Sequence, residues 1–215
     1  MMQIKTIQAK TLTARVLLHP TGNAQPIRQG WLEQACLRPS PNFNPRPDGT
    51  AIRLIVLHNI SLPPAQFGGG YLEQFFLNQL DASVHPYFQT IDSLKVSAHL
   101  LILRTGEVIQ FVSFDDRAWH AGRSSYLAVP ECNDYSIGIE LEGTDDSAFT
   151  EAQYRAVIEA IFAIQQAYPH TRHHLAGHSD IAPGRKTDPG VHLDWQRIRK
   201  SLAQAHQKSS HQLEK

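Results

Sequence analysis

Residues 51–58 read Ala-Ile-Arg-Leu-Ile-Val-Leu-His, an apolar run that ends on a histidine. A short run of this kind, bounded by turn signals, is typical of a buried β-strand. Residues 136–141, Ser-Ile-Gly-Ile-Glu-Leu, predict a second buried strand. Two further β-rich runs, 99–104 and 107–112, flank a Thr-Gly pair, and this spacing predicts a hairpin.

Helical signals lie between and after these strands. Residues 150–153, Thr-Glu-Ala-Gln, match a capping box, and apolar residues recur at helical spacing after them. Residues 71–80 fit a short helix, and Asp194 could cap a last helix that runs to about residue 205. Mixed strands and helices with one hairpin predict a single α/β domain, with a central mixed β-sheet flanked by helices.

The domain organisation follows from the same patterns. The chain has 215 residues, which fits one domain. Residues 1–29 show no strong periodicity and are predicted to be an N-terminal extension. The domain proper is predicted over residues 30–205. Residues 206–215 are polar, and we expect them to form a frayed C-terminal tail.

Composition excludes several classes of protein. Lys plus Arg and Asp plus Glu both number 20, so no basic excess favours nucleic-acid binding. The 2 cysteines are too few for a disulfide framework. The first ten residues lack the apolar core of a signal peptide, and no apolar run approaches the length of a membrane span. We therefore expect a cytoplasmic protein with no membrane partner.

Three residues are candidate metal ligands. His58 ends the first buried strand, His178 follows a glycine, and Asp188 lies in a compact Pro- and Gly-containing segment. Two imidazoles and one carboxylate make a three-ligand zinc site with an open fourth position, which is the catalytic form of zinc. The sequence therefore predicts one Zn²⁺ per chain and a hydrolytic reaction. Asp188 precedes Pro-Gly, however, and could be an ordinary turn residue.

Two further residues are candidates for the chemistry itself. Strand alternation places Glu140 and Glu142 on one face, and a carboxylate in an apolar strand is costly unless it is paired or functional. Near a zinc-bound water, Glu140 could act as general base. Lys186 could direct its charge at a developing oxyanion. The ordinary alternatives are a salt-bridged strand carboxylate and a solvated loop lysine.

The chain resembles a known family over most of its length, from about residue 30 to residue 195. Four segments carry the resemblance: residues 56–64, 117–122, 136–143 and 177–190. They look like the type 2 (AmpD-like) N-acetylmuramoyl-L-alanine amidases and occur in the family's order. Within this family the resemblance favours the cytoplasmic 1,6-anhydro-N-acetylmuramyl-L-alanine amidases of peptidoglycan recycling.

The resemblance implies a function and a set of site residues. It implies that His58, His178 and Asp188 bind zinc in a groove on one face of the sheet. It implies that Glu140 activates the water and that Lys186 stabilises the tetrahedral intermediate. The implied substrates are anhydromuropeptides, cut between the lactyl group and L-alanine, with no obligate protein partner. The residues implied to line the substrate groove are Asn59, Trp119, Leu141 and Arg185.

Two positions depart from the family pattern. Close relatives tend to carry arginine where this chain has Lys95 and Glu131. Arginine binds a carboxylate bidentately and lysine does not, so recognition of the stem-peptide carboxylates would be weaker or rearranged. The alternatives are a broader amidase acting on intact peptidoglycan and a non-catalytic muropeptide-binding module of the same fold. A serine hydrolase is disfavoured because the chain has no G-x-S-x-G segment.

Overall fold

The computed structural model describes residues 26–213, and its centre is a 6-stranded sheet. The first four strands in the order below are parallel, β7 is antiparallel to β6, and β3 is parallel to β7. The predicted mixed sheet is therefore confirmed. In spatial order the strands are β12 (Leu175–Gly177), β5 (Leu54–Ile60), β11 (Ser136–Glu142), β6 (Leu100–Ile102), β7 (Val108–Gln110) and β3 (Cys36–Leu37).

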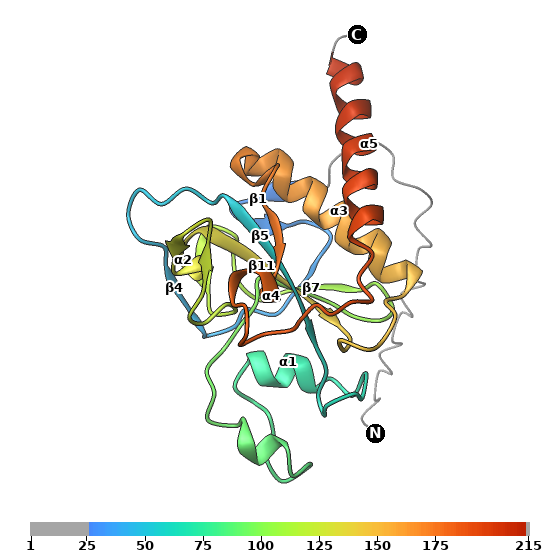
Figure 1. The fold of residues 1–215 in the computed structure, drawn as a ribbon. Helices are drawn as coiled ribbons and strands as arrows, with labels where there is room; N and C mark the ends of the chain where they lie inside the picture. The colour runs from blue at the N-terminus through green and yellow to red at the C-terminus, as the bar shows by residue number, and fades with distance from the viewer. Residues whose placement is uncertain (1–25, 214–215) are drawn as a thin grey trace, which may run out of the picture.

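Helices cover both faces of this sheet. The two long helices, α3 (Glu151–Ala167) and α5 (Trp195–Leu213), pack against each other on one face, and α1 (Tyr71–Phe76) lies across the sheet from them (Figure 1). The remaining elements are short: β1 (Ile27–Arg28), β2 (Trp31–Leu32), β4 (Phe43–Pro45), η1 (Phe88–Thr90), β8 (Asp116–Ala118), β9 (Ser125–Tyr126), β10 (Val129–Pro130), α2 (Cys132–Tyr135), η2 (Pro169–Thr171) and α4 (His178–Ile181).

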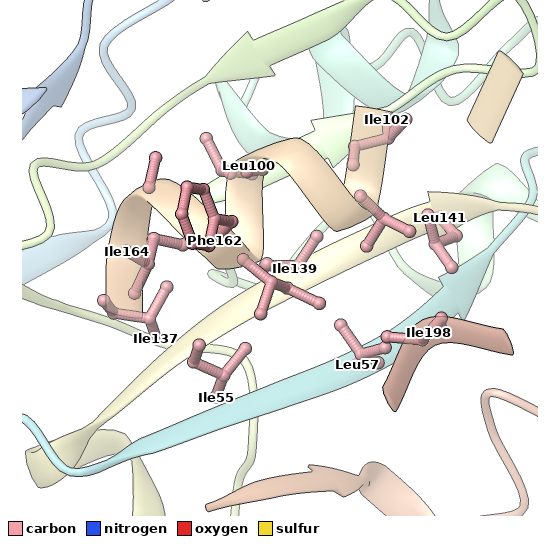
Figure 2. Close-up of a cluster of buried hydrophobic side chains, with 14 of the residues drawn as sticks. Ile55, Leu57, Leu100, Ile102, Ile137, Ile139, Leu141, Phe162, Ile164 and Ile198 are labelled. Carbon is pink, nitrogen blue, oxygen red and sulfur yellow. The ribbon is translucent and has the colours of Figure 1, made fainter. Parts of the chain in front are cut away.

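Strand alternation divides the core between the two faces of the sheet. Ile137, Ile139 and Leu141 of β11 point toward α3, where they pack with residues such as Phe162 (Figure 2). The intervening positions of the same strand, which include Glu140, face the other way. The apolar face therefore fixes the register of β11 and leaves its opposite face for polar side chains.

The predicted helix ends were less accurate than the predicted strands. α1 ends at Phe76 instead of residue 80, because Asn78 adopts a left-handed conformation with φ 58°. The prediction of a frayed C-terminal tail was also wrong up to Leu213, since α5 continues to that residue. His206 anchors it through a hydrogen bond to Gln165 Oε1 at 2.7 Å and a ring contact with Phe162.

The N-terminal boundary is only partly described. Residues 1–25 of the predicted extension lie outside the described residues, but β1 pairs with β2, so the last part of that extension belongs to the fold. The division at residue 30 stays a prediction. Between residues 26 and 213, no helix has both the length and the hydropathy needed to cross a bilayer.

The predicted capping box at the start of α3 is confirmed. The Gln153 amide N–H donates to Thr150 Oγ1, and the Thr150 amide N–H donates to Gln153 Oε1, both at 3.1 Å. Thr150→Ala should lower the free energy of unfolding by about 1 kcal/mol, as loss of an N-cap does. Urea unfolding measures the change, with the exposed turn variant Thr105→Ala as control. Equal losses in the two variants would contradict a specific role for the cap.

Candidate active site

The candidate site lies at the carboxyl ends of the parallel strands. His58 is near the end of β5, and His178 directly follows β12. Glu140 of β11 is the register partner of His58, so their side chains emerge side by side on the same face. Ligands of open α/β sheets bind outside the carboxyl ends of parallel strands, so the topology places these residues where a ligand site is expected.

Three of the predicted residues converge there. His58 Nδ1 lies 2.9 Å from His178 Nδ1 and 3.2 Å from Asp188 Oδ2, and His178 Nδ1 lies 3.0 Å from the same carboxylate oxygen. Their possible ligand atoms all lie within 4.8 Å of one another. The loop that carries Asp188 is held by a hydrogen bond from the Ser179 amide to the Asp188 carbonyl. These three residues could therefore hold one metal ion.

Hydrogen bonding and burial determine which ring nitrogens face the site. His178 Nε2 lies 3.1 Å from the carbonyl oxygen of Ala121. Because a carbonyl only accepts, Nε2 carries the hydrogen and Nδ1 is left as the nitrogen that can bind a metal. Burial lowers the pKa of His58 to about 4, which keeps that ring neutral. Two imidazoles and a carboxylate are a ligand set that fits zinc.

Glu140 is buried beside these donors without a full set of partners. Its Oε2 has no hydrogen-bond partner within the described part of the chain, and its Oε1 is 4.0 Å from His58 Nδ1. Burial, and then the charge of Asp188, raise the pKa of Glu140 well above its usual value, while the Lys186 ammonium lowers it. An unpaired buried carboxylate with a raised pKa is typical of a proton-transferring group.

Glu142 has a different environment on the same strand face. Its Oε1 accepts from the Gly68 amide at 2.6 Å and its Oε2 from the Arg104 amide at 2.9 Å. Both carboxylate oxygens therefore bind backbone amides, and Glu142 stabilises the local structure. Of these two carboxylates, Glu140 is therefore the one with an oxygen left unpaired beside the metal-site candidates.

The loop before Asp188 carries Arg185 and Lys186, both exposed. Arg185 Nη2 donates to the carbonyls of Ala121 and Arg123, each at 2.7 Å. The guanidinium thus ties this loop to the segment that also accepts from His178. Lys186 is close enough for its charge to act on Glu140 and His58.

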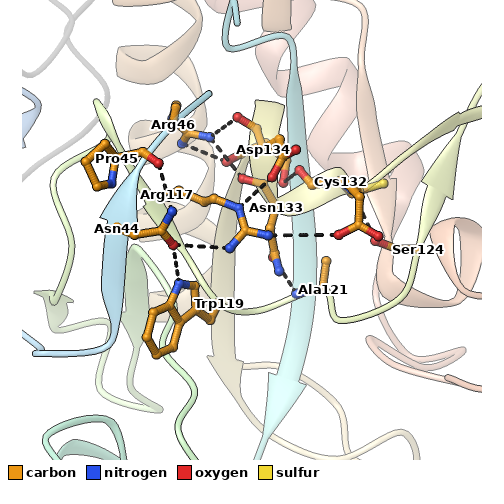
Figure 3. A network of polar contacts seen from close by, with 12 residues as sticks. Asn44, Pro45, Arg46, Arg117, Trp119, Ala121, Ser124, Cys132, Asn133 and Asp134 are labelled. Carbon is orange, nitrogen blue, oxygen red and sulfur yellow. Dashed lines mark hydrogen bonds and ion pairs between the residues drawn. The ribbon is translucent and has the colours of Figure 1, made fainter. Parts of the chain in front are cut away.

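Trp119 and Asn59 are sequence neighbours of His120 and His58, and each has a polar partner. Trp119 is half-buried, and its Nε1 donates to Asn44 Oδ1 at 2.6 Å, within the polar network of Figure 3. The side-chain Nδ2 of Asn59 donates to Asp145 Oδ1 at 2.7 Å, and this hydrogen bond holds the loop after β11. Their predicted contact with substrate stays a prediction.

The Leu141 side chain does not face the metal-ligand candidates, and the predicted contact of Leu141 with substrate stays a prediction. Leu141 is 1% exposed and belongs to the core cluster beneath α3. The physical reason is strand alternation: Glu140 faces the metal ligands, so its neighbour in β11 faces the opposite side of the sheet.

His120 lies beside His58, although no sequence pattern indicated this. Its Nδ1 lies 2.9 Å from Nε2 of His58, on the side of that ring away from the other ligands. The glycine at position 138 of the strand is the one sequence feature that fits this contact. A Cβ at Gly138 would lie 2.4 Å from the His120 ring, so only glycine leaves room for it. Asn44 and Asp145 were also missed, and no sequence pattern pointed to them.

Comparisons with known proteins identify the family of this chain. A model of the N-acetylmuramoyl-L-alanine amidase family matches residues 48–191. The chain is 51% identical over 173 residues to the 1,6-anhydro-N-acetylmuramyl-L-alanine amidase AmpD of Escherichia coli K12, covering 80% of this chain and 94% of that protein.

Solved structures of related amidases share the fold. A crystal structure of a selenomethionine derivative of AmpD is similar with a TM-score of 0.80 and 50% identity, over 81% of this chain and 98% of that one. AmpDh3 from Pseudomonas aeruginosa in complex with anhydromuramic pentapeptide is similar with a TM-score of 0.52 and 30% identity, over 72% and 61% of the two chains. The chain therefore belongs to the N-acetylmuramoyl-L-alanine amidase family.

Proposed function

We propose that this protein is a zinc-dependent amidase of peptidoglycan recycling. It hydrolyses the amide bond between the lactyl group of 1,6-anhydro-N-acetylmuramic acid and L-alanine of the stem peptide. The observation that carries the proposal is the unpaired oxygen of Glu140 beside the converging donors of His58, His178 and Asp188. The name of the 51% identical relative supports the substrate.

The proposed mechanism assigns one task to each group. His58, His178 and Asp188 would hold zinc, which would supply Lewis-acid polarisation of the scissile carbonyl and make the attacking water more acidic. Glu140 takes the proton from the attacking water and returns it to the leaving amine of L-alanine. Lys186 places a positive charge where the carbonyl oxygen becomes negative. No covalent intermediate with the protein forms.

Substrate recognition is proposed for residues around this centre. Trp119 offers a half-buried ring whose polar edge is already paired, so its face can pack on the sugar or the peptide stem. Arg185 and Asn59 are proposed to complete the groove. Lys95 and Glu131 are both exposed. Because neither side chain can bind a carboxylate bidentately as arginine does, the carboxylates of the stem peptide are bound more weakly. The proposed location is the cytoplasm, where anhydromuropeptides are recycled.

Mass spectrometry of two substrates tests this function. The zinc-loaded protein is incubated with an anhydromuropeptide and, separately, with intact sacculus fragments, each with and without a chelator. Release of free peptide and anhydro-muramic acid, abolished by chelator and restored by zinc, is the expected result. Cleavage of both substrates would indicate a broader amidase. Binding without cleavage by zinc-loaded protein would leave a muropeptide-binding module as the better account.

A further inference from the structure

Three hydrogen bonds run in series behind the His58 ring. His58 Nε2 lies 2.9 Å from His120 Nδ1, His120 Nε2 lies 3.1 Å from Ser136 Oγ, and Ser136 Oγ lies 2.5 Å from the carbonyl oxygen of Cys132. The series begins at a proposed metal ligand and ends on the backbone of α2. Its members come from β5, from the segment after β8, and from β11.

The backbone carbonyl fixes the direction of every hydrogen bond in the series. The Cys132 carbonyl can only accept, so Ser136 donates its single hydroxyl hydrogen to it. Ser136 Oγ must then accept from Nε2–H of His120. In a neutral ring this leaves His120 Nδ1 as an acceptor, so His58 Nε2 carries the donated hydrogen. The Nδ1 lone pair of His58 is thereby left facing His178 and Asp188.

The surroundings of His120 hold its ring in place. The His58 and His99 rings contact it edge-on, and no carboxylate hydrogen-bonds to it among residues 26–213. A side chain at Gly138 would meet the ring, with ring atoms 2.4 to 2.6 Å from the Cβ position. Asn133 Oδ1 accepts from the amides of His120 and Ala121, at 3.1 and 2.8 Å; the bond to Ala121 is visible in Figure 3.

We propose that His120 and Ser136 are positioning residues that hold His58 in the tautomer with a free Nδ1, and so set the metal affinity of the site. The inference rests on the proposed metal-binding role of His58. Without the Ser136 hydroxyl, His120 can hold its hydrogen on Nδ1 and donate to His58 Nε2. The His58 hydrogen then moves to Nδ1, where it blocks the metal-binding lone pair.

The first test compares Ser136→Ala with a matched control, Ser40→Ala. Both serines are buried, and Ser40 Oγ also donates to a backbone carbonyl, that of Phe76, at 2.6 Å. Zinc affinity is measured by competition with a chromophoric chelator. Ser136→Ala is expected to bind zinc about 10-fold more weakly, at the lower end of effects from residues behind a metal ligand, and Ser40→Ala as tightly as the wild type. Equal affinities in the two variants would overturn the proposal.

The second test observes the tautomer itself in metal-free protein. Nitrogen-15 NMR of the imidazole rings should show His58 protonated at Nε2 in the wild type and in Ser40→Ala. Ser136→Ala should show hydrogen at Nδ1 in part of the molecules. Unchanged His58 ring signals in Ser136→Ala would overturn the proposal. This measurement needs neither substrate nor zinc. Its result therefore tests the tautomer proposal independently of the proposed amidase function.

Two substitutions of His120 complete the test. His120→Ala removes the acceptor for His58 and should weaken zinc binding by about 10- to 100-fold. His120→Asn keeps an amide oxygen that can accept from His58 Nε2, and should recover most of the affinity. Equal losses in the two variants, at equal thermal stability, would show that the ring only fills space.

Discussion

Glu140→Gln is expected to bind zinc as the wild type does and to lose turnover by about 10²- to 10⁴-fold, the usual contribution of a general base. The amide keeps the shape of the carboxyl group but cannot take a proton from water. None of the three converging ligand atoms belongs to Glu140, so metal binding should be retained. Steady-state kinetics on an anhydromuropeptide, together with the zinc content of the same preparation, measure both outcomes.

The stability of this variant gives a second, independent readout. Glu140 Oε2 is buried without a hydrogen-bond partner within residues 26–213, and burial is the main cause of its raised pKa. Replacing a buried, poorly satisfied carboxylate with a neutral amide should leave the Tm of the metal-free protein equal to the wild type or raise it. Active-site residues commonly lower the stability of the fold because their reactivity requires an unfavourable environment.

Glu142→Gln is the matched control on the same strand face. Both Glu142 oxygens accept from backbone amides, and a glutamine can replace only one of these acceptors. We expect a loss of about 1–3 kcal/mol in the free energy of unfolding, with zinc binding and chemistry retained. If Glu140→Gln kept its turnover while zinc-loaded, the general-base role of Glu140 would be wrong.

The strands could be predicted from the sequence because local signals define them. The apolar run that became β5 ends at the carboxyl edge of the sheet, where its histidine faces the site. The capping box located the start of α3 to the residue. Helix ends could not be predicted as well. The length of α5 depends on His206 meeting Gln165 and Phe162, a tertiary contact that the polar sequence of the helix does not indicate.

The site shows the same division between local and tertiary information. Alternation along β11 predicts which carboxylates share a face, and applied consistently it also excludes the Leu141 side chain from that face. The family resemblance gives the position of Leu141 but not the direction of its side chain, which lies in the core beneath α3. His120 could not be placed, because its contact with His58 depends on a loop crossing β11 at Gly138.

His178→Ala should abolish zinc binding and turnover together. The substitution removes one of three converging donors, and the remaining imidazole and carboxylate do not complete a catalytic zinc site. Loss of several kcal/mol of transition-state stabilisation by the metal corresponds to a fall in turnover of roughly 10³-fold or more. Metal content after dialysis against zinc and the rate of amide cleavage measure the two losses.

Thermal stability separates loss of the metal site from loss of the fold. Zinc at 100 times its Kd should stabilise the wild type by about 2.7 kcal/mol, whereas the Tm of His178→Ala should not respond to zinc. The control is His206→Ala, which removes another buried histidine, hydrogen-bonded to Gln165 on the α3 side of the sheet. It should lower the Tm yet keep the zinc-dependent rise. A zinc-dependent rise of full size in His178→Ala would exclude this residue from the metal site and place the ion elsewhere.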